Sequence, residues 1–369
     1  MFYIKIDNDV DENEMNQQLL FSTDRVDQLN GYNAYDISID WEIGSAGSLN
    51  FIVPKGNPAY DLIRPLGTSV YLYRNSDLIW FGRILDITKN MELYKSVSCE
   101  GALAFLNDIV TRPIIYRGSD PRRSASDHLT SILAEYNLRC SKKRHLEVSY
   151  NLPQSWSDVS YCSYYGIDSW STVSDAVKSV LEIDPDVFIY THTLDARPTI
   201  VIGTLPGNTI TVPLQFGKNI VDMSVEQRGS DICTSVIPLG KDNISMDGIS
   251  KTTGLEGTYG YIEKTYSLSS IDDPDVLEDA ADILVSELAK KQFPDLEIQA
   301  VDLYSYCQVS GISPTEIHLG TAVPIKSPLW AHDISAYYVC HKISMTIGTL
   351  ENTSYTFEYI SQSDMPPMP

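Results

Sequence analysis

The sequence lacks the short motifs by which the common enzyme classes are found. It has no HExxH motif of a zinc protease, no GxSxG turn, no P-loop and no GxGxxG loop. Its six histidines show no metal-ligand spacing, and its six cysteines lie more than twenty residues apart without a CxxC pair. We therefore expect free thiols, no metal, no cofactor and no catalytic centre.

Positive charge and long apolar runs are also scarce. There are 27 lysines and arginines against 49 acidic residues, so the formal net charge is −22 and the chain repels nucleic-acid phosphates. No stretch approaches the ~20 apolar residues of a membrane span, and the first residues lack the basic and apolar regions of a signal peptide. These absences predict a chain made in a cytoplasm, without sequence-specific binding of nucleic acid.

The composition is that of a folded protein, and 369 residues predict two to four folding units. Residues 34 to 110 alternate polar and apolar side chains, as in Tyr35–Trp41 and Ser69–Tyr73, with turn residues between the runs. Strand follows strand without a long helix, which favours a small barrel or sandwich. Helical patterns appear after Ser124, over 171–182 and after Ser270, so the rest is α+β.

Two stretches of the sequence resemble each other at long range. The first opens with Leu66, Gly67, Thr68 and Val70 and ends at Glu100; the second opens with Leu319, Gly320, Thr321 and Val323 and ends at Glu358. The offset is 253 residues at the opening and 258 at the close, which a five-residue insertion near 328–333 would reconcile. Either two hairpins are alike by chance, or one chain holds two copies of a small β-barrel. A cyclic trimer of such chains would present six similar barrels.

The order of motifs is similar to that of a known family. The residues that carry this resemblance are Trp80–Ile87, Val97–Asp108, Asn219–Met223, Thr234–Gly240 and His318–Val323. In this order they resemble the baseplate hub proteins of bacteriophage tails, both the hubs of contractile tails and the N-terminal part of siphophage tail-associated lysins. The lysins continue into a hydrolase domain, whereas this sequence stops soon after Ile360. We therefore expect any cell-wall hydrolase to be another polypeptide.

The resemblance implies a β-rich α+β fold with two related small β-barrels and two smaller α+β domains. The expected domains are a first barrel over 1–110, an α+β domain over 111–215, a second barrel over 216–250 with 312–365, and an inserted α+β domain over 251–311.

The same resemblance implies a structural role rather than an enzymatic one. The chain would form a homotrimer in the virion tail, between the tail tube or distal tail protein ring and a tip, spike or lysin protein. A tape-measure protein would lie in its channel, and DNA would pass through it. Two other classes stay open, a carbohydrate-binding receptor module and a hydrolase with an unrecognised active site.

Two groups of residues are candidates for contact with partners. Eight basic residues gather between 112 and 144, and they form either a solvated face or a contact with an acidic partner: Arg112, Arg117, Arg122, Arg123, Arg139, Lys142, Lys143 and Arg144. Aromatic residues gather between 156 and 170, for sugar stacking or for protein contact, and include Trp156, Tyr164 and Tyr165. Asp7, Asp9 and Asp11 resemble a calcium loop that lacks its glycine, which favours a solvated acidic surface.

Overall fold

The structure is a computed structural model of the whole chain. It describes residues 1–8, 16–115, 124–157, 166–167, 170–182, 184, 186–194, 197–205, 208–245, 250–269, 271, 273–301, 303, 307, 316–327, 334–348 and 352–359.

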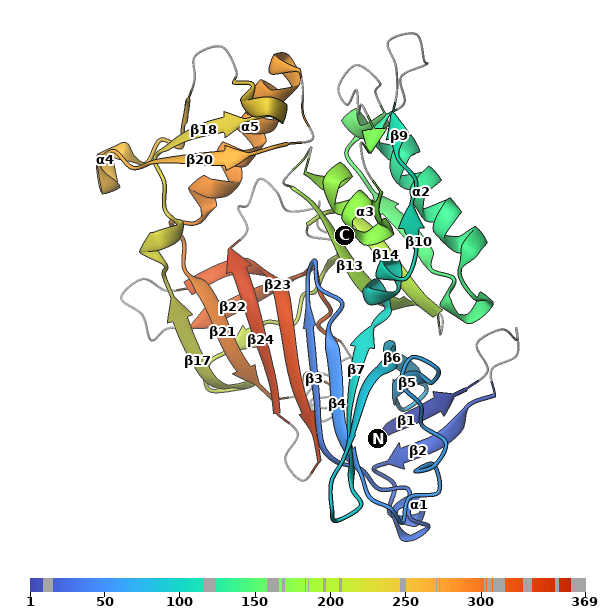
Figure 1. Cartoon of the computed structure of the whole chain (residues 1–369). Coiled ribbons are helices and arrows are strands. Elements are labelled where there is room, and N and C mark those ends of the chain that lie inside the picture. Colours follow the sequence, from blue (N-terminus) through green and yellow to red (C-terminus); the bar gives the residue numbers. More distant parts are fainter. Residues whose placement is uncertain are drawn as a thin grey trace.

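Within the described residues, fourteen strands form one large, curled, mostly antiparallel sheet (Figure 1). Its order is β17-β21-β24-β23-β3-β4-β7-β6-β5-β1-β2, and β22 joins β23, β15 and β16 beside this path. The strands are β1 (Phe2–Asp7), β2 (Gln18–Ser22), β3 (Tyr35–Glu42), β4 (Ser48–Val53), β5 (Ser69–Arg74), β6 (Asp77–Lys89), β7 (Lys95–Gly101), β15 (Asn208–Thr209), β16 (Leu214–Gln215), β17 (Ile220–Glu226), β21 (Asp295–Ala300), β22 (Thr321–Ser327), β23 (Ile334–Ile347) and β24 (Asn352–Tyr359).

The sheet buries two separate apolar clusters, because its polar and apolar side chains alternate between its faces. One cluster is built mainly from β1 to β7, with the end of β23, and contains Ile4, Leu49, Phe51 and Trp80. The other is built from the strands after residue 208 and contains Phe357 among others. Each half of the sheet therefore has its own core, and the short helix α1 (Arg25–Leu29) lies beside β2.

A middle unit of three strands and two helices lies above one end of the sheet (Figure 1). Its strands are β10 (Glu147–Asn151), β13 (Val187–Leu194) and β14 (Arg197–Thr204), and its helices are α2 (Ala125–Arg139) and α3 (Val173–Leu181). It also contains the 3-10 helices η1 (Ala102–Asn107), η2 (Lys142–Arg144) and η3 (Gln154–Ser157). Two short strand pairs complete it, β8 (Val110–Thr111) with β12 (Ser171–Thr172) and β9 (Ile114–Ile115) with β11 (Gly166–Ile167). Its core continues into the sheet through Tyr71 and Phe81.

An inserted unit lies between β17 and β21 in the sequence and above them in space (Figure 1). Its elements are η4 (Gly229–Asp231), β18 (Ser235–Leu239), η5 (Lys241–Asn243), β19 (Lys251–Thr252), α4 (Glu256–Tyr259), β20 (Glu263–Ser267) and α5 (Pro274–Lys290). The strand pairings differ from the expected range of 251–311. Strand β18 pairs with β19 and β20 and not with the large sheet, whereas β21 lies inside the large sheet. Hydrogen bonding decides this, and the sequence pattern of a short strand does not reveal its partner.

The long helices follow from local signals in the sequence. Ser124 caps α2 by accepting a hydrogen bond from the backbone N–H of Asp127, and the apolar positions of α2 are buried as their spacing indicated. Helix α5 begins at Pro274 rather than near Ser270, because Asp273 is its N-cap and Pro274 takes the first helical position. It buries Leu277, Leu284 and Leu288 on one face.

Candidate functional site: two equivalent sets of strands and the contacts at their ends

Strands β5, β6 and β7 and strands β22, β23 and β24 form two antiparallel meanders with the same pairing. In each, the second strand lies between the first and the third. The third strands also pair with β4 and β21, and these pair in turn with β3 and β17. Five strands in one half of the sheet therefore have five counterparts in the other half, and within each set the strands pair in the same order and directions.

The match extends to an irregularity in the middle strand. The register of β6 against β7 shifts between Ile84 and Asp86, and that of β23 against β24 shifts between Cys340 and Lys342. A β-bulge bends its strand and increases the local twist, so the two halves bend at the same place. The bulged residues, Leu85 and His341, are counterparts.

The strand registers also locate the inserted residues. The offset between counterparts is 253 residues in β5 and β22, 256 in β6 and β23, and 258 in β7 and β24. Three extra residues therefore fall between β22 and β23 and two between β23 and β24. This differs from the single insertion expected near 328–333, a segment that lies outside the described residues.

The bends before β5 and β22 differ by one position. The backbone N–H of Leu66 donates to Ile84 O at 2.7 Å, and that of Gly320 donates to the counterpart, Cys340 O, at 2.9 Å. Both donors have positive φ, 57° for Leu66 and 74° for Gly320. Gly67 is not among the positive-φ residues. Gly67 and Gly320, which align in the sequence, therefore do not occupy equivalent positions in the two bends. The equivalent residues are Leu66 and Gly320, because these two have positive φ and donate the equivalent backbone hydrogen bond.

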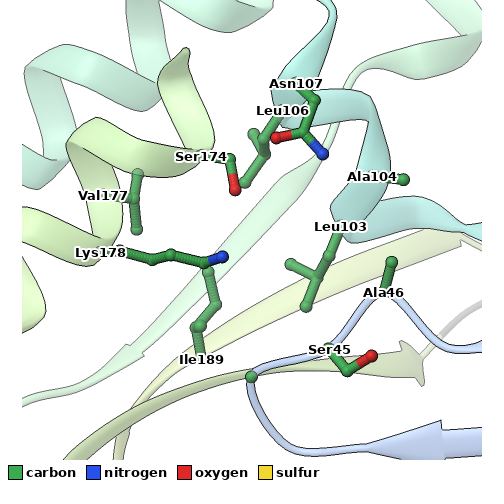
Figure 2. A pocket seen from close by; sticks show the side chains of 11 residues that line it. Ser45, Ala46, Leu103, Ala104, Leu106, Asn107, Ser174, Val177, Lys178 and Ile189 are labelled. Carbon is green, nitrogen blue, oxygen red and sulfur yellow. The ribbon is translucent and has the colours of Figure 1, made fainter. Parts of the chain in front are cut away.

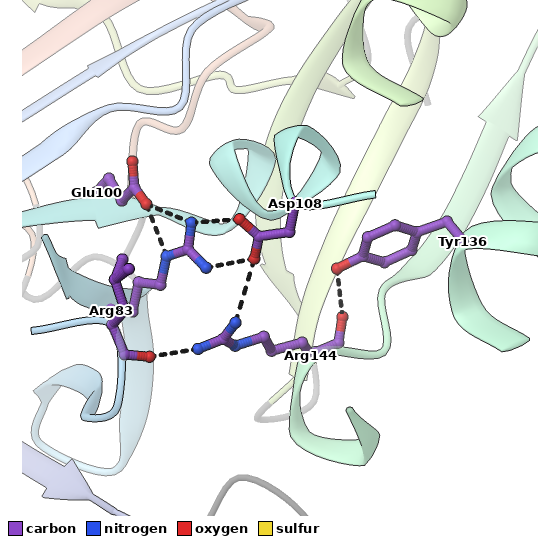
Figure 3. A network of polar contacts seen from close by, with 6 residues as sticks. Arg83, Glu100, Asp108, Tyr136 and Arg144 are labelled. Carbon is purple, nitrogen blue, oxygen red and sulfur yellow. Dashed lines mark hydrogen bonds and ion pairs between the residues drawn. The ribbon is translucent and has the colours of Figure 1, made fainter. Parts of the chain in front are cut away.

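Glu100, one of the repeated positions, belongs to an ion network that ties the sheet to the middle unit (Figure 3). Arg83 lies opposite Glu100 in the strand pairing and donates from Nε to Glu100 Oε1 at 2.6 Å. It also donates from Nη2 to Asp108 Oδ1 at 2.8 Å. Burial lowers the pKa of Arg83, but the hydrogen bonds to Asp108 and Glu100 outweigh it and the pKa is raised. The signal for this site was a charged residue inside the apolar run of β6.

Arg144 completes the network from the other side (Figure 3). It donates from Nη1 to Asp108 Oδ2 at 3.1 Å and from Nη2 to the backbone carbonyl of Leu66. Its own carbonyl accepts a hydrogen bond of 3.0 Å from the hydroxyl of Tyr136 in α2. The guanidinium of Arg144 therefore joins the bend before β5 to the end of η1, and its backbone carbonyl joins both to helix α2.

Glu358, the counterpart of Glu100, lies in a second network at the matching end of the other half. Its Oε2 is 3.0 Å from His341 Nε2, and its Oε1 is 3.3 Å from Lys291 Nζ just after α5. Burial lowers the pKa of His341, while the charge of Glu358 opposes this. Glu358 therefore links the sheet to the inserted unit, as Glu100 links it to the middle unit.

A cavity of about 280 Å³ adjoins Glu358 and is lined by residues of the sheet and of both smaller units. Asp186 and Glu287 form a close carboxylate pair there, beside Lys290. Burial first, and then the hydrogen bond and charge of Glu287, raise the pKa of Asp186 to about 8. One proton is therefore shared where the middle and inserted units meet, which the sequence did not indicate.

A second cavity, of about 260 Å³, lies between the β3–β4 turn, η1, α3 and β13 (Figure 2). It is lined mainly by small and apolar side chains such as Ala46, Leu103 and Val177, with Lys178 at its side. Within the described residues, no group of three or more His, Cys, Asp or Glu side chains could hold a metal ion. No helix there is long and apolar enough to cross a membrane.

Several residues expected to contact partners make contacts inside the chain. Lys143 is 7% exposed and forms an ion pair of 2.7 Å with Asp7, whose side chain is fully buried. Asp7 is thus no part of a solvated acidic surface. Arg144 is committed to the network described above, and Trp156 is buried and donates from Nε1 to Asp184 Oδ2 at 2.8 Å. Contacts with distant residues decide these positions, and the local charge pattern does not show them.

The remaining candidates for partner contact are divided. Arg112 and Lys142 are exposed. Arg139 is 45% exposed and pairs with Glu135 at 3.2 Å, within its own helix. Trp170 is 66% exposed, so the aromatic region presents a large side chain to solvent although Trp156 does not. Residues outside the described part of the chain are Arg117, Arg122, Arg123, Tyr164 and Tyr165.

Comparisons with known proteins place this architecture among tail proteins. No protein-family model and no curated protein sequence matches the chain. Several solved structures match it over most of its length. One is a tail protein from Neisseria meningitidis MC58, with a TM-score of 0.64 and 14% identity over 97% of this chain and 96% of that one. Another is the 43 kDa tail protein of prophage MuSo2 from Shewanella oneidensis, with a TM-score of 0.61 and 12% identity over 97% of this chain and 98% of that one. A third is an E. coli type VI secretion component described as structurally similar to T4 bacteriophage tail proteins gp27 and gp5, with a TM-score of 0.53 and 9% identity over 89% of this chain and 74% of that one.

At these identities the comparisons show the fold. The fold is that of phage tail proteins and of a related secretion component, with a large curled sheet and a few helices. The first two neighbours are matched over nearly their whole length, so the smaller units belong to the shared architecture and are not additions peculiar to this chain.

Proposed function

We propose that this chain is a structural hub of a phage-type tail or phage-derived injection particle. It forms a trimeric ring with a central channel that adapts the sixfold tail tube to a threefold tip. The observation that carries the proposal is the equivalence of the two five-strand sets, including the bulges at Leu85 and His341.

The equivalence gives a geometric reason for three chains. Because each chain presents two similar sets of strands, a cyclic trimer presents six similar sets on one side. The two smaller units differ from each other, so the opposite side repeats only three times. One ring can then bind six tube subunits on one side and a threefold tip, spike or lysin protein on the other.

The proposal includes the passage of a tape-measure protein and of DNA through the channel, in a virion tail assembled in the host cytoplasm. The formal charge of −22 per chain supports weak contact with DNA, since an acidic wall repels phosphates. The proposed role is not enzymatic, which is supported by the similarity of the fold to tail proteins.

A carbohydrate-binding module is the second candidate, and Trp170 is the exposed aromatic side chain that favours it. Its case is weaker than the sequence suggested, because Trp156 is buried and bound to Asp184. Binding of glycans to the purified protein, lost in a Trp170→Ala variant, would favour this candidate over the hub.

The number of chains in the assembled particle tests the hub proposal. Electron cryomicroscopy of tails and native mass spectrometry of the purified protein should both find three copies around one axis, with the large sheets towards the channel. A particle that contains one copy of the chain, or a ring of another symmetry, would overturn the proposal.

A further inference from the structure

The junction between the two halves of the sheet is a direct strand pairing. One edge of β23 pairs with β24. On its other edge, β23 pairs first with β22 and then, over Lys342–Ile347, with Ile37–Glu42 of β3. Strand β3 has β4 on its remaining edge. The second strand set is thus joined to the first through β23 and β3.

Strand β6 is the counterpart of β23, and β17 is the counterpart of β3. In this chain β6 and β17 each have an open edge. Strand β6 pairs with β5 only as far as Arg83, so one edge of residues 86–89 has no partner strand among the described residues. Strand β17 pairs with β21 and ends the sheet. Asp86, Thr88 and Glu226 are exposed, and Met91 beside them is 100% exposed.

We propose that the open edge of β6 in one chain pairs, antiparallel, with the open edge of β17 in a second copy of the chain. This contact repeats between chains the β3–β23 junction that exists inside each chain. It rests on the proposed function, and it assigns the strands that close the ring.

The counterpart positions fix the register of this pairing. Ser98 in β7 corresponds to Thr356 in β24. Their partners on the next strands, Asn50 and Glu297, therefore correspond to each other. The partners of these two, Ser38 in β3 and Ser224 in β17, correspond in the same way. Transferring the register of β3 against β23 to β17 against β6 gives four residue pairs. They are Asp86 with Arg228, Ile87 with Gln227, Thr88 with Glu226, and Lys89 with Val225. Gln227 and Arg228 directly follow β17, so the proposed pairing extends this strand by two residues.

The side chains brought together by this register are chemically compatible. Inside the chain, Ser344 Oγ donates to Asp40 Oδ1 at 2.5 Å, and the counterparts Thr88 and Glu226 are again a hydroxyl and a carboxylate. Lys342 lies opposite Glu42, and the counterparts Asp86 and Arg228 again have opposite charges. Opposite charges across strands stabilise a pairing, while like charges destabilise it.

A second copy is the occupant that the geometry favours. The two open edges are on different strands, so the contact is head to tail and closes only as a ring or continues as a filament. Open strand edges recruit further strands unless something covers them, and here the internal junction shows how such an edge is covered. In a trimer, three internal and three external junctions would make six similar junctions in one continuous sheet.

Disulfide crosslinking tests the strand assignment. A Thr88→Cys, Glu226→Cys double variant, oxidised both as purified protein and within assembled tails, should give covalent dimers and trimers on non-reducing gels. Each single variant alone should give none, and an equal mixture of the two single variants should give dimers but no trimers. An Asp40→Cys, Ser344→Cys variant is the matched internal control, because its disulfide should form within one chain without a change of mass.

A register control and a charge exchange sharpen the test. Thr88→Cys with Val225→Cys should not crosslink, because adjacent residues in a strand point to opposite faces. Asp86→Arg should weaken self-association about tenfold, since it places two cations together, and adding Arg228→Asp should restore it.

The outcomes separate this inference from the function on which it rests. A trimer that forms without the Thr88–Glu226 crosslink, or that responds to neither charge variant, would overturn the strand assignment and leave the hub intact. Tails without a trimer of this chain would overturn the proposed function itself.

Discussion

Lys143 and Asp7 form an ion pair closed to solvent, with 2.7 Å between Nζ and Oδ2. Asp7 ends β1 and Lys143 lies in η2, so the pair fixes the middle unit against the large sheet. Lys143→Met would leave a buried carboxylate without its facing cation, and we expect a loss of about 3–5 kcal/mol in the free energy of unfolding. Chemical denaturation measures this.

The neighbouring Lys142 is exposed and provides the matched control. Lys142→Met should change the free energy of unfolding by less than about 0.5 kcal/mol. A double variant with Asp7→Leu and Lys143→Met should regain most of the lost stability, because it buries no charge. Equal effects of the two lysine variants would show that the Lys143 ion pair does not hold the units together.

Trp156 and Trp170 should respond differently to the same substitution. Trp156→Phe removes the N–H that reaches Asp184 Oδ2 in the core, so we expect a loss of about 1–3 kcal/mol. Trp170 is 66% exposed, and Trp170→Phe should be close to neutral. Thermal unfolding of the two variants compares them, and a large loss from Trp170→Phe alone would contradict this account.

Gly82 allows a close approach between strands that its counterpart in the other half does not need. A Cβ on Gly82 would collide with the backbone of Glu100 and the ring of Trp80. Gly82 pairs with Gly101, whereas the counterpart pair is Tyr338 with Tyr359, which pack edge to face.

Gly82→Ala should therefore destabilise the chain by about 1–3 kcal/mol, through overpacking. Gly257→Ala serves as control, since a Cβ there meets nothing within 4 Å. It should be neutral or slightly stabilising within helix α4. Urea denaturation of the two variants measures both, and a tolerated Gly82→Ala would mean that the Glu100 backbone and the Trp80 ring can both shift.

The sequence predicted those features of the fold that depend on local signals. Helix α2 begins where Ser124 caps it. The two similar strand sets could be recognised in the sequence because the same alternation of polar and apolar residues recurs. It did not predict which charged residues are used internally. Lys143 reaches Asp7 across 136 positions and Arg144 reaches Leu66 across 78, so no local window contains both partners.

The bend before each first strand shows the limit of the sequence comparison. Gly67 and Gly320 align in the sequence, yet φ is +74° at Gly320 and the left-handed residue of the other bend is Leu66. Gly320→Ala should cost about 1–2 kcal/mol, the penalty of a left-handed residue with a Cβ. In Gly67→Ala the new Cβ would have only ordinary contacts at 3.7 Å, so this variant should be nearly neutral. Equal losses in denaturation experiments would contradict the one-residue difference between the bends.

The carboxylate pair of Asp186 and Glu287 should make stability depend on pH. Burial and the Glu287 carboxylate raise the pKa of Asp186 to about 8, whereas an unfolded Asp ionises near ~3.9. Between these values the folded chain holds a proton that the unfolded chain has lost. Stability should therefore fall as the pH rises through this window, and the fall should end above about pH 8.

Asp186→Asn removes this titration, so its unfolding temperature should fall less than that of the unaltered chain between about pH 5 and about pH 8. Buried His341 has a lowered pKa and acts in the opposite direction, because its stabilisation grows as the pH rises through the usual histidine range. It is present in both proteins, so the difference between their curves isolates Asp186. Asp279→Asn, at an exposed position of α5, should leave the curve unchanged. An Asp186→Asn curve parallel to that of the unaltered chain would show that no proton is held between the middle and inserted units.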